Sequence, residues 1–275
     1  MDENESFFER FAYKLVEKHI AGKTMSAAIA RALVMNEREL LADLTFLSDV
    51  PDNRAKISYI TNTYMQLARQ MGRFGIKGSM SVPIDQLGSS MSIDVACESV
   101  AKIQKTCNHY DTFAWYQVGN SDADLKVASS LESSDRFGVA FCDFQILAKF
   151  MKTCKARNIK LVVEGERDMK ELLGEKGARN SGIAAAISKA RRVAIMCPND
   201  SVMEKVAKGS RDEGKFTFEF EFGDAEKRWA KISKKGQISI YMPFGKDWVR
   251  YAINKVPEGH IRSFASELIK HKEEE

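Results

Sequence analysis

Short runs of apolar residues alternate along the chain with longer amphipathic segments. Most of the short runs are nearly continuous in apolar residues, which is typical of β-strands covered on both faces. The predicted strands are residues 40–46, 79–84, 112–118, 137–142, 160–164, 193–197, 216–220 and 238–242. The run at 216–220 differs from the others because apolar and polar positions alternate in it.

The segments between these runs have helical periodicity. Residues 54–73 place their apolar side chains on one stripe, as in an amphipathic helix. Ser92 and Ser121 each precede a helical segment, where a serine hydroxyl can cap the first turn. Two helices are predicted before the first strand, at 5–20 and 24–36, and residues 247–253 and 263–271 have a helical pattern at the other end.

This succession of strands and helices predicts the fold class. Eight βα units joined by right-handed crossovers form a closed (β/α)8 TIM-like barrel of parallel strands. An open doubly wound sheet is the alternative, but no strand is followed by the G-x-G-x-x-G turn that would mark its switch point. We expect residues 1–37 to form N-terminal helices packed on the barrel and residues 38–275 to form the barrel domain.

Composition excludes several classes of protein. The chain has 42 basic and 38 acidic residues, and this net charge of +4 is not concentrated as nucleic-acid binding requires. The first residues are acidic, without the pattern of a secretory signal, and no apolar run is long enough for a membrane span. The five cysteines form no C-x-x-C pair, so neither a disulfide framework nor a zinc site is predicted. These features favour a cytoplasmic protein that acts on a small molecule.

The reactive groups of such barrels lie at the carboxyl ends of the strands. Carboxylates dominate these positions, which predicts a locally acidic barrel mouth. The residues are Asp43, Asp85, Gln117, Cys142, Asp143, Glu164, Glu166, Cys197, Asn199, Asp200, Glu219, Glu221 and Tyr241. Asp143, Asp200 and Asp224 are explained more simply as helix caps. Glu164 and Glu219 could form a general base or ligate a metal if both point inward.

The other reactive residue types give less support for catalysis. None of the four histidines falls at a predicted strand end, which disfavours acid–base chemistry by histidine. Cys142 and Cys197 are either nucleophiles or small core residues, and no histidine lies near them in the sequence to activate a thiol. The polar segment 174–182 before a helix is either an anion-binding loop or a surface loop.

Residues 241–251 read Y-M-P-F-G-K-D-W-V-R-Y. This run resembles a signature of the proline dehydrogenase family, Y-x-P-Y-G-x-x-W on the last barrel strand, followed by Y-x-x-R-R-x-x-E. Residues 80–88 are similar to the family strand I-S-x-K-x-x-Q-L-G, and residues 216–223 to F-E-F-Q-x-L-x-G. Residues 160–162 resemble the start of R-L-V-K-G-A-Y, and residues 194–199 a strand end A-T-H-D or A-T-H-N. The resemblance extends from about residue 23 to residue 268.

The resemblance implies a distorted (β/α)8 barrel with FAD at its mouth. The family reaction is the oxidation of L-proline to pyrroline-5-carboxylate by hydride transfer to the flavin. The matching positions suggest two sets of site residues. The substrate cleft would contain Tyr251, Lys255, Glu258, Asn254, Gln117 and Asp85, and the cofactor would contact Cys142, Arg167, Asn199 and Glu219.

This chain departs from the family at most polar positions of the site. The substituted positions are Pro83 for lysine, Gln117 and Gly119 for D-x-E, Cys142 for glutamine, Val163 for lysine, Pro198 for histidine and Glu219 for glutamine. Asn254 and Lys255 replace the two arginines. Because asparagine is uncharged and lysine lacks the planar fork, a substrate carboxylate loses its bidentate partners.

Three hypotheses follow from this pattern. The first is a proline dehydrogenase-like oxidoreductase with an altered substrate or much reduced activity. The second is a non-catalytic barrel with a binding or regulatory role. The third is a cation-dependent lyase or hydrolase that uses Asp85, Glu164 and Glu219. The sequence gives neither the electron acceptor nor the oligomeric state.

Overall fold

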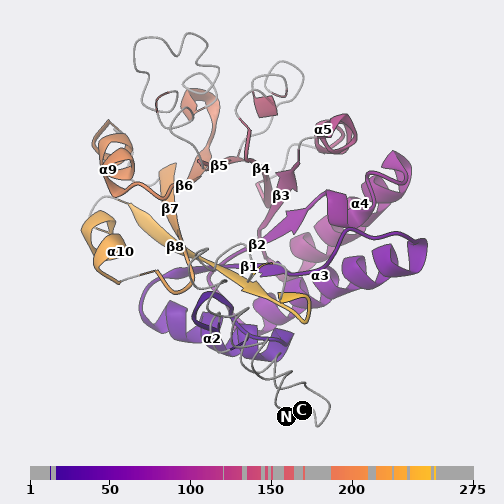
Figure 1. Ribbon diagram of the computed structural model, residues 1–275, viewed down its shortest axis with the longest axis horizontal. Helices are drawn as coiled ribbons and strands as arrows, with labels where there is room; N and C mark the ends of the chain where they lie inside the picture. Colours follow the sequence, from indigo (N-terminus) through magenta and orange to yellow (C-terminus); the bar gives the residue numbers. More distant parts are fainter. Residues whose placement is uncertain are drawn as a thin grey trace, which may run out of the picture.

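A computed structural model describes residues 13, 17–119, 121–131, 135–143, 146, 147, 150, 158–163, 170, 187–209, 215–224, 226–233, 236–248 and 251. Within these ranges, eight parallel strands close into a barrel in which each strand pairs with its neighbours in chain order (Figure 1). They are β1 (Leu41–Phe46), β2 (Gly78–Pro83), β3 (Ala114–Val118), β4 (Phe137–Phe141), β5 (Asn158–Val162), β6 (Arg192–Met196), β7 (Phe216–Glu221) and β8 (Gln237–Phe244). The predicted (β/α)8 fold is confirmed.

Helices surround this barrel (Figure 1). Those within the described ranges are η1 (Glu17–His19), α2 (Met25–Glu37), α3 (Arg54–Phe74), η2 (Asp85–Leu87), α4 (Ile93–Tyr110), α5 (Asp122–Ser129), α9 (Asp200–Gly209) and α10 (Glu226–Ile232). None of the described helices is long and apolar enough to cross a membrane. The helices predicted at 5–20 and after residue 247 lie largely outside the described residues.

The helices begin where the sequence places capping side chains. The hydroxyls of Thr24, Ser92 and Ser121 each accept a hydrogen bond from the backbone N–H three residues further along. Such a bond satisfies one of the N–H groups that a helix start leaves without a partner. Helix α3 ends at Gly75, whose φ of 63° belongs to the left-handed region that glycine adopts without strain.

The strand boundaries differ from the predicted ones by only a few residues. The largest shift is at β5, which ends at Val162, so that Glu164 follows the strand and lies outside the described residues. Pro83 is the last residue of β2 and donates no N–H to the ladder. The pairing with β3 continues past it, because the N–H groups of Met80 and Ile84 face β3 and donate to the carbonyls of Phe113 at 2.9 Å and Gln117 at 3.0 Å.

Helix α2 precedes the barrel in sequence and packs against its two terminal strands, β1 and β8. At the end of this helix Asn36 connects it to two parts of the barrel. Its Nδ2 atom donates to the carbonyls of Leu40 and Lys77, each at 2.8 Å, and its Oδ1 accepts the N–H of Lys77 at 2.7 Å. The helix therefore covers the seam at which the barrel closes.

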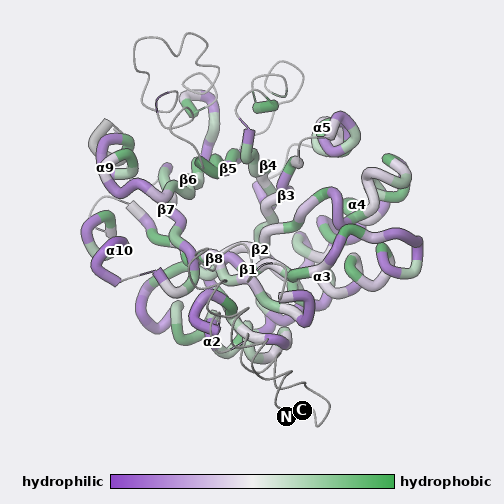
Figure 2. Tube along the Cα trace, in the orientation of Figure 1, coloured by the Kyte–Doolittle hydropathy of each residue, from purple (hydrophilic) through white to green (hydrophobic). Residues whose placement is uncertain are grey.

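The apolar residues form two separate cores. The larger core fills the space between strands and helices, and the strands β4 to β6 are mostly hydrophobic along their length (Figure 2). A smaller cluster lies inside the barrel and consists of Phe113, Trp115, Ala140 and Ala194. Gly138 makes room for it, because a Cβ there would lie 2.2 Å from Cζ3 of Trp115. The barrel lumen is thus packed, not open.

Candidate functional site

Three charged side chains meet inside the barrel. Nζ of Lys160, on β5, lies 2.6 Å from Oδ2 of Asp43 on β1 and 2.5 Å from Oε1 of Glu219 on β7. All three side chains are at most 1% exposed. Because β1 and β5 lie opposite each other in a ring of eight strands, Lys160 crosses the lumen. Its neighbours in register, Ala140 and Ala194, are small and leave space for this long side chain.

Hydroxyl groups complete the contacts of Asp43. Ser79 donates to Oδ1 at 2.8 Å, and Ser81 donates to Oδ2 at 2.6 Å. Ser81 also accepts a hydrogen bond from Nζ of Lys160 at 3.1 Å. The ring of Tyr241 on β8 lies 5.4 Å from the same nitrogen, within the range of a cation–π contact. We call Asp43, Ser81, Lys160, Glu219 and Tyr241 the lumen cluster.

Burial and charge shift the pKa values in the lumen cluster. Burial favours the neutral form of Lys160, but the carboxylates of Asp43 and Glu219 outweigh it and raise the lysine pKa, which keeps the ammonium charged. Burial raises the pKa of Glu219 to about 8, against the attraction of Lys160 and with the added repulsion of Asp43. Near neutral pH the cluster therefore contains a charged lysine and a largely protonated Glu219.

Such a cluster is unusual for the inside of a (β/α)8 barrel. Bulky branched apolar residues generally fill the layers of the lumen, and alternate strands contribute them. Here β1, β5 and β7 contribute charged groups to the interior instead. A buried ion pair is costly to desolvate and contributes little net stability over an apolar layer. Ionisable groups with perturbed pKa values in such a place mark a candidate functional site.

Asp43 lies deeper in the barrel than its predicted place at a strand end. It is the third residue of β1 and is fully buried, so it faces the lumen and not the mouth. Glu219 points inward, as required for the expected carboxylate pair, but its partners are Lys160 and Asp43. The other member of that pair, Glu164, lies outside the described residues, as does Glu166.

Two candidates of the substrate cleft lie at the ends of β2 and β3. Gln117 is half-buried on β3, with Pro83 beside it in register. Asp85 follows β2 and accepts the N–H of Gln86 at 2.8 Å. Burial raises the pKa of Asp85, and the nearby charge of Asp124 adds to this effect. The region between β2 and α5 is therefore acidic.

The two cysteines at strand ends have different surroundings. Cys142 after β4 is exposed, so the interpretation of this residue as part of the core is wrong. Cys197 after β6 is buried. Burial raises the pKa of the Cys197 thiol, which opposes formation of the nucleophilic thiolate. This environment is typical of a structural cysteine.

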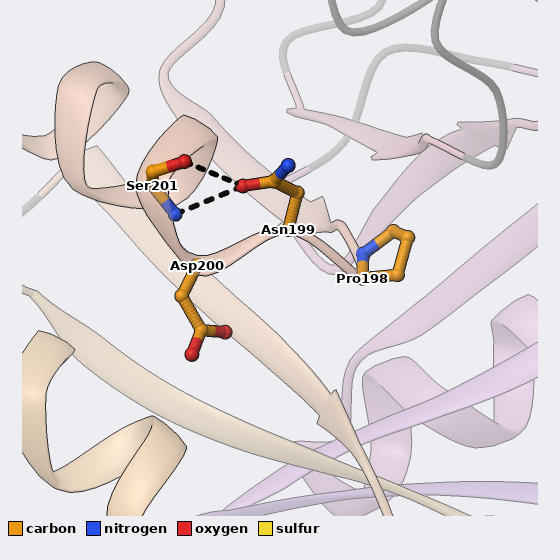
Figure 3. Close-up of a pocket in the computed structure, with 4 residues that line it drawn as sticks. All are labelled: Pro198, Asn199, Asp200 and Ser201. Carbon is orange, nitrogen blue, oxygen red and sulfur yellow. Dashed lines mark hydrogen bonds between the residues drawn. The ribbon is translucent and has the colours of Figure 1, made fainter.

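A depression of about 550 Å³ lies beside the start of α9 and is lined by Pro198, Asn199, Asp200 and Ser201 (Figure 3). The side-chain oxygen of Asn199 points toward Ser201 and accepts hydrogen bonds from its N–H at 3.0 Å and its hydroxyl at 2.7 Å. It also accepts the N–H of Val202 at 3.3 Å. Asn199 is therefore the cap of α9, a role that we had predicted for Asp200.

Arg228 of α10 joins the loops after β6 and β7. Its Nε lies 2.9 Å from Oδ1 of Asp200, its Nη1 lies 2.7 Å from Oδ2 of Asp224, and its Nη2 donates to the carbonyl of Pro198 at 2.9 Å. Two carboxylates therefore already neutralise this guanidinium. Asp224 also accepts the N–H of Glu221 at 3.2 Å, a turn contact and not the predicted helix cap.

The structure places one further predicted substrate residue near the lumen cluster. Tyr251 is half-buried, and burial raises its pKa, with Tyr241, Glu221 and Asp224 close enough to add to the shift. Tyr251 and Tyr241 therefore lie at the same end of the barrel. Four other candidates, Asn254, Lys255, Glu258 and Arg167, lie outside the described residues.

Lys160 is the functional candidate that sequence analysis missed. It was assigned to the start of a buried strand and given no role. A usable signal does exist, because Asp43, Lys160 and Glu219 are charged residues within the predicted buried strands 40–46, 160–164 and 216–220. Opposite charges at such positions indicate pairing inside a closed barrel, because a buried charge requires a partner.

Comparison with known proteins supports the resemblance seen in the motifs. No protein-family profile matches the chain. The chain is 18% identical over 278 residues to proline dehydrogenase 1 of Bacillus subtilis (strain 168), a match that covers 88% of this chain and 85% of that protein. The corresponding protein of Bacillus subtilis subsp. natto is 17% identical over 259 residues, with the same coverage of both chains.

Solved structures of proline utilization A (PutA) share the fold. The Bdellovibrio bacteriovorus protein, inactivated by N-propargylglycine, superposes with a TM-score of 0.64 and 12% identity over 87% of this chain and 32% of that chain. The protein from Corynebacterium freiburgense also gives 0.64 and 12%, over 96% of this chain and 35% of that chain. The chain thus spans about one third of the length of these proteins. The chain therefore shares the fold of these structures and has a low sequence similarity to proline dehydrogenase 1, in agreement with the motif resemblance.

Proposed function

We propose that this protein is a proline dehydrogenase-like barrel in which the FAD-dependent oxidation of L-proline is lost or much reduced, and that it serves as a binding module for another small molecule. The lumen cluster is the observation that carries this proposal. Glu219 stands where the family has a glutamine, and it is buried against Lys160 and Asp43. A flavin-contacting amide has thus been replaced by a carboxyl group that belongs to an interior charge network.

The described residues do not fit FAD. The dinucleotide is an anion, and its phosphates require cations or free backbone N–H groups. Lys160 is already paired with two carboxylates, and so is Arg228 at the ends of β6 and β7. The N–H groups at the start of α9 are bonded to Asn199. The cations and amides at these strand ends are therefore already occupied by the protein itself.

The same charge balance disfavours an anionic substrate. The carboxylate of L-proline requires a cation, whereas the described side chains near β2 and β3 include the acidic pair Asp85 and Asp124. The family arginines correspond to Asn254 and Lys255, which offer no planar fork. A neutral or cationic small molecule suits this acidic mouth better than proline does.

An oxidoreductase with an altered substrate is the second candidate. It is favoured by the two tyrosines of the family motif, Tyr241 and Tyr251, which lie together at the carboxyl end of β8. The match to proline dehydrogenase 1 over 88% of the chain also supports it. In that case the protein would oxidise another small amine, and the lumen cluster would have a purely structural role.

Turnover assays distinguish the two candidates. The purified protein is supplied with FAD, an artificial electron acceptor and either L-proline or a panel of uncharged and cationic secondary amines. The wild type is compared with Glu219→Gln, which restores the amide of the family at that position. We expect no turnover of L-proline by either protein. Oxidation of another amine would favour the second candidate, and oxidation of L-proline at a rate typical of enzymes would contradict both.

A further inference from the structure

The charges inside the lumen do not balance if each side chain has its usual ionisation state. Lys160 supplies one positive charge, whereas Asp43 and Glu219 would supply two negative charges. All three groups are at most 1% exposed, so water does not screen the remaining charge. An uncompensated negative charge in the buried lumen is strongly unfavourable, so one of the two carboxylates takes up a proton instead.

We propose that Asp43 and Glu219 hold one extra proton between them at neutral pH, and that loss of this proton in alkaline solution weakens the closed barrel. The lumen is then a built-in pH-sensitive element that is distinct from any binding role of the mouth. It concerns the folded barrel itself and is independent of whether the protein binds a flavin.

The hydrogen bonds indicate which carboxyl group carries the proton. Asp43 accepts bonds from Ser79, Ser81 and Lys160, and these donors stabilise a carboxylate. Glu219, in contrast, contacts Lys160 and receives no hydroxyl donor among the described hydrogen bonds. Its carboxylate form is therefore less well stabilised than that of Asp43. This difference in donors places the proton on Glu219.

The other groups that face Glu219 do not supply the missing charge. β1 contributes Asp43, β5 contributes Lys160 and β8 contributes Tyr241. The pKa of Tyr241 is raised by burial, so its phenol stays neutral. Ser81 of β2 is an uncharged hydroxyl. Among the described residues, the cation paired with Glu219 is Lys160, which Asp43 already shares.

The direction of the pH effect follows from proton linkage. In the unfolded chain Glu219 titrates near its usual pKa of 4.5, whereas in the folded barrel its pKa is raised to about 8. Between these values the folded state retains a proton that the unfolded state has lost. The contribution of Glu219 to the free energy of unfolding is fully present below pH 4.5 and decreases as the pH rises toward 8.

The test uses the wild type, Glu219→Gln and a control, Glu98→Gln, which makes the same change at an exposed site on α4. Proton uptake during refolding at neutral pH is measured with an indicator dye. We expect the wild type and the control to take up about one proton more than Glu219→Gln, because glutamine cannot bind it. The urea midpoint of the wild type should decrease from acidic toward alkaline pH, and that of Glu219→Gln should stay nearly constant over this range.

Infrared spectroscopy of the wild type provides a second readout if Glu219→Gln does not fold. A protonated carboxyl group has a carbonyl stretch distinct from that of a carboxylate. We expect this band at neutral pH and its loss as the pH rises above about 8. Absence of the band at neutral pH would overturn the proposal, and so would equal proton uptake by the wild type and Glu219→Gln.

Discussion

Lys160 stands where most (β/α)8 barrels have a branched apolar side chain. From β5 it reaches across the lumen to Asp43 and Glu219, and the small residues Ala140 and Ala194 on either side make this possible. Because the ammonium contacts two carboxyl groups, its removal affects more than one contact.

Replacing Lys160 by methionine preserves most of the volume but leaves two carboxyl groups without a cation. We expect a loss of about 3–5 kcal/mol in the free energy of unfolding, because a buried charge then has no partner. The measurement is urea denaturation at neutral pH, with Lys102→Met on the exposed surface of α4 as the matched control. A loss equal to that of the control would show that the ion pairs contribute nothing.

The packing of Gly138 against Trp115 inside the barrel can be tested by substitution. In Gly138→Ala the added Cβ would lie 2.2 Å from Trp115 and 2.9 Å from Cβ of Asn158. Overpacking of this kind costs about 1–3 kcal/mol. Trp115→Phe removes the obstructing part of the ring, so the double variant should lose less than the sum of the two single losses. Additive losses in a double-mutant cycle would argue against this contact.

Some side-chain contacts could be predicted from the sequence, and others could not. The caps Ser92 and Ser121 were predicted correctly because a helix start has a local signature. The partners of Lys160 were not identified, since they are 117 residues away at Asp43 and 59 at Glu219 in the sequence. Such contacts depend on barrel closure and on strand parity, which a one-residue slip reverses.

At the scale of elements, α2 holds together the seam between the first and last strands. Asn36 makes three hydrogen bonds at the end of this helix, two of them to the backbone of Lys77 just before β2. These bonds join residues 41 positions apart and fix the helix relative to β1 and β2. The position of α2 on the barrel therefore depends on this one amide side chain.

Asn36→Ala should destabilise the barrel by about 0.5–1.5 kcal/mol, because three hydrogen bonds to partly exposed backbone groups are lost. Hydrogen exchange should increase at α2 and at the start of β2. Glu37→Ala, at the adjacent exposed position, is the control and should change stability by less than about 0.5 kcal/mol. Similar effects of the two substitutions would show that Asn36 does not hold the seam.

Most elements could be predicted because their patterns are strong. Short apolar runs, most of them nearly continuous, located all eight strands, and one apolar stripe located α3. The prediction placed β5 two residues late, because the valines at its end continue the apolar run beyond the last paired residue. The prediction therefore put Glu164 at the end of the strand and Lys160 at its start, whereas Lys160 lies in the middle of β5.

At the scale of the whole molecule, a closed barrel similar to that of the PutA structures is combined with a charged interior. The sequence is 18% identical to proline dehydrogenase 1 over 88% of this chain, and the motif resemblance implies that most polar site positions differ from that family. At the ends of β6 and β7, Asp200 and Asp224 surround Arg228, whereas the acidic character of the whole mouth stays a prediction. We expect that the fold has been retained while the flavin site was lost.

The visible absorption spectrum of the protein as purified, without added cofactor, tests this claim most directly. We expect a colourless protein without the absorption bands of a flavin, because Lys160 in the lumen and Arg228 at the ends of β6 and β7 are already paired with acidic side chains. Denaturation should likewise release no flavin into solution. A yellow protein with a flavin spectrum, present at about one flavin per chain, would contradict the account.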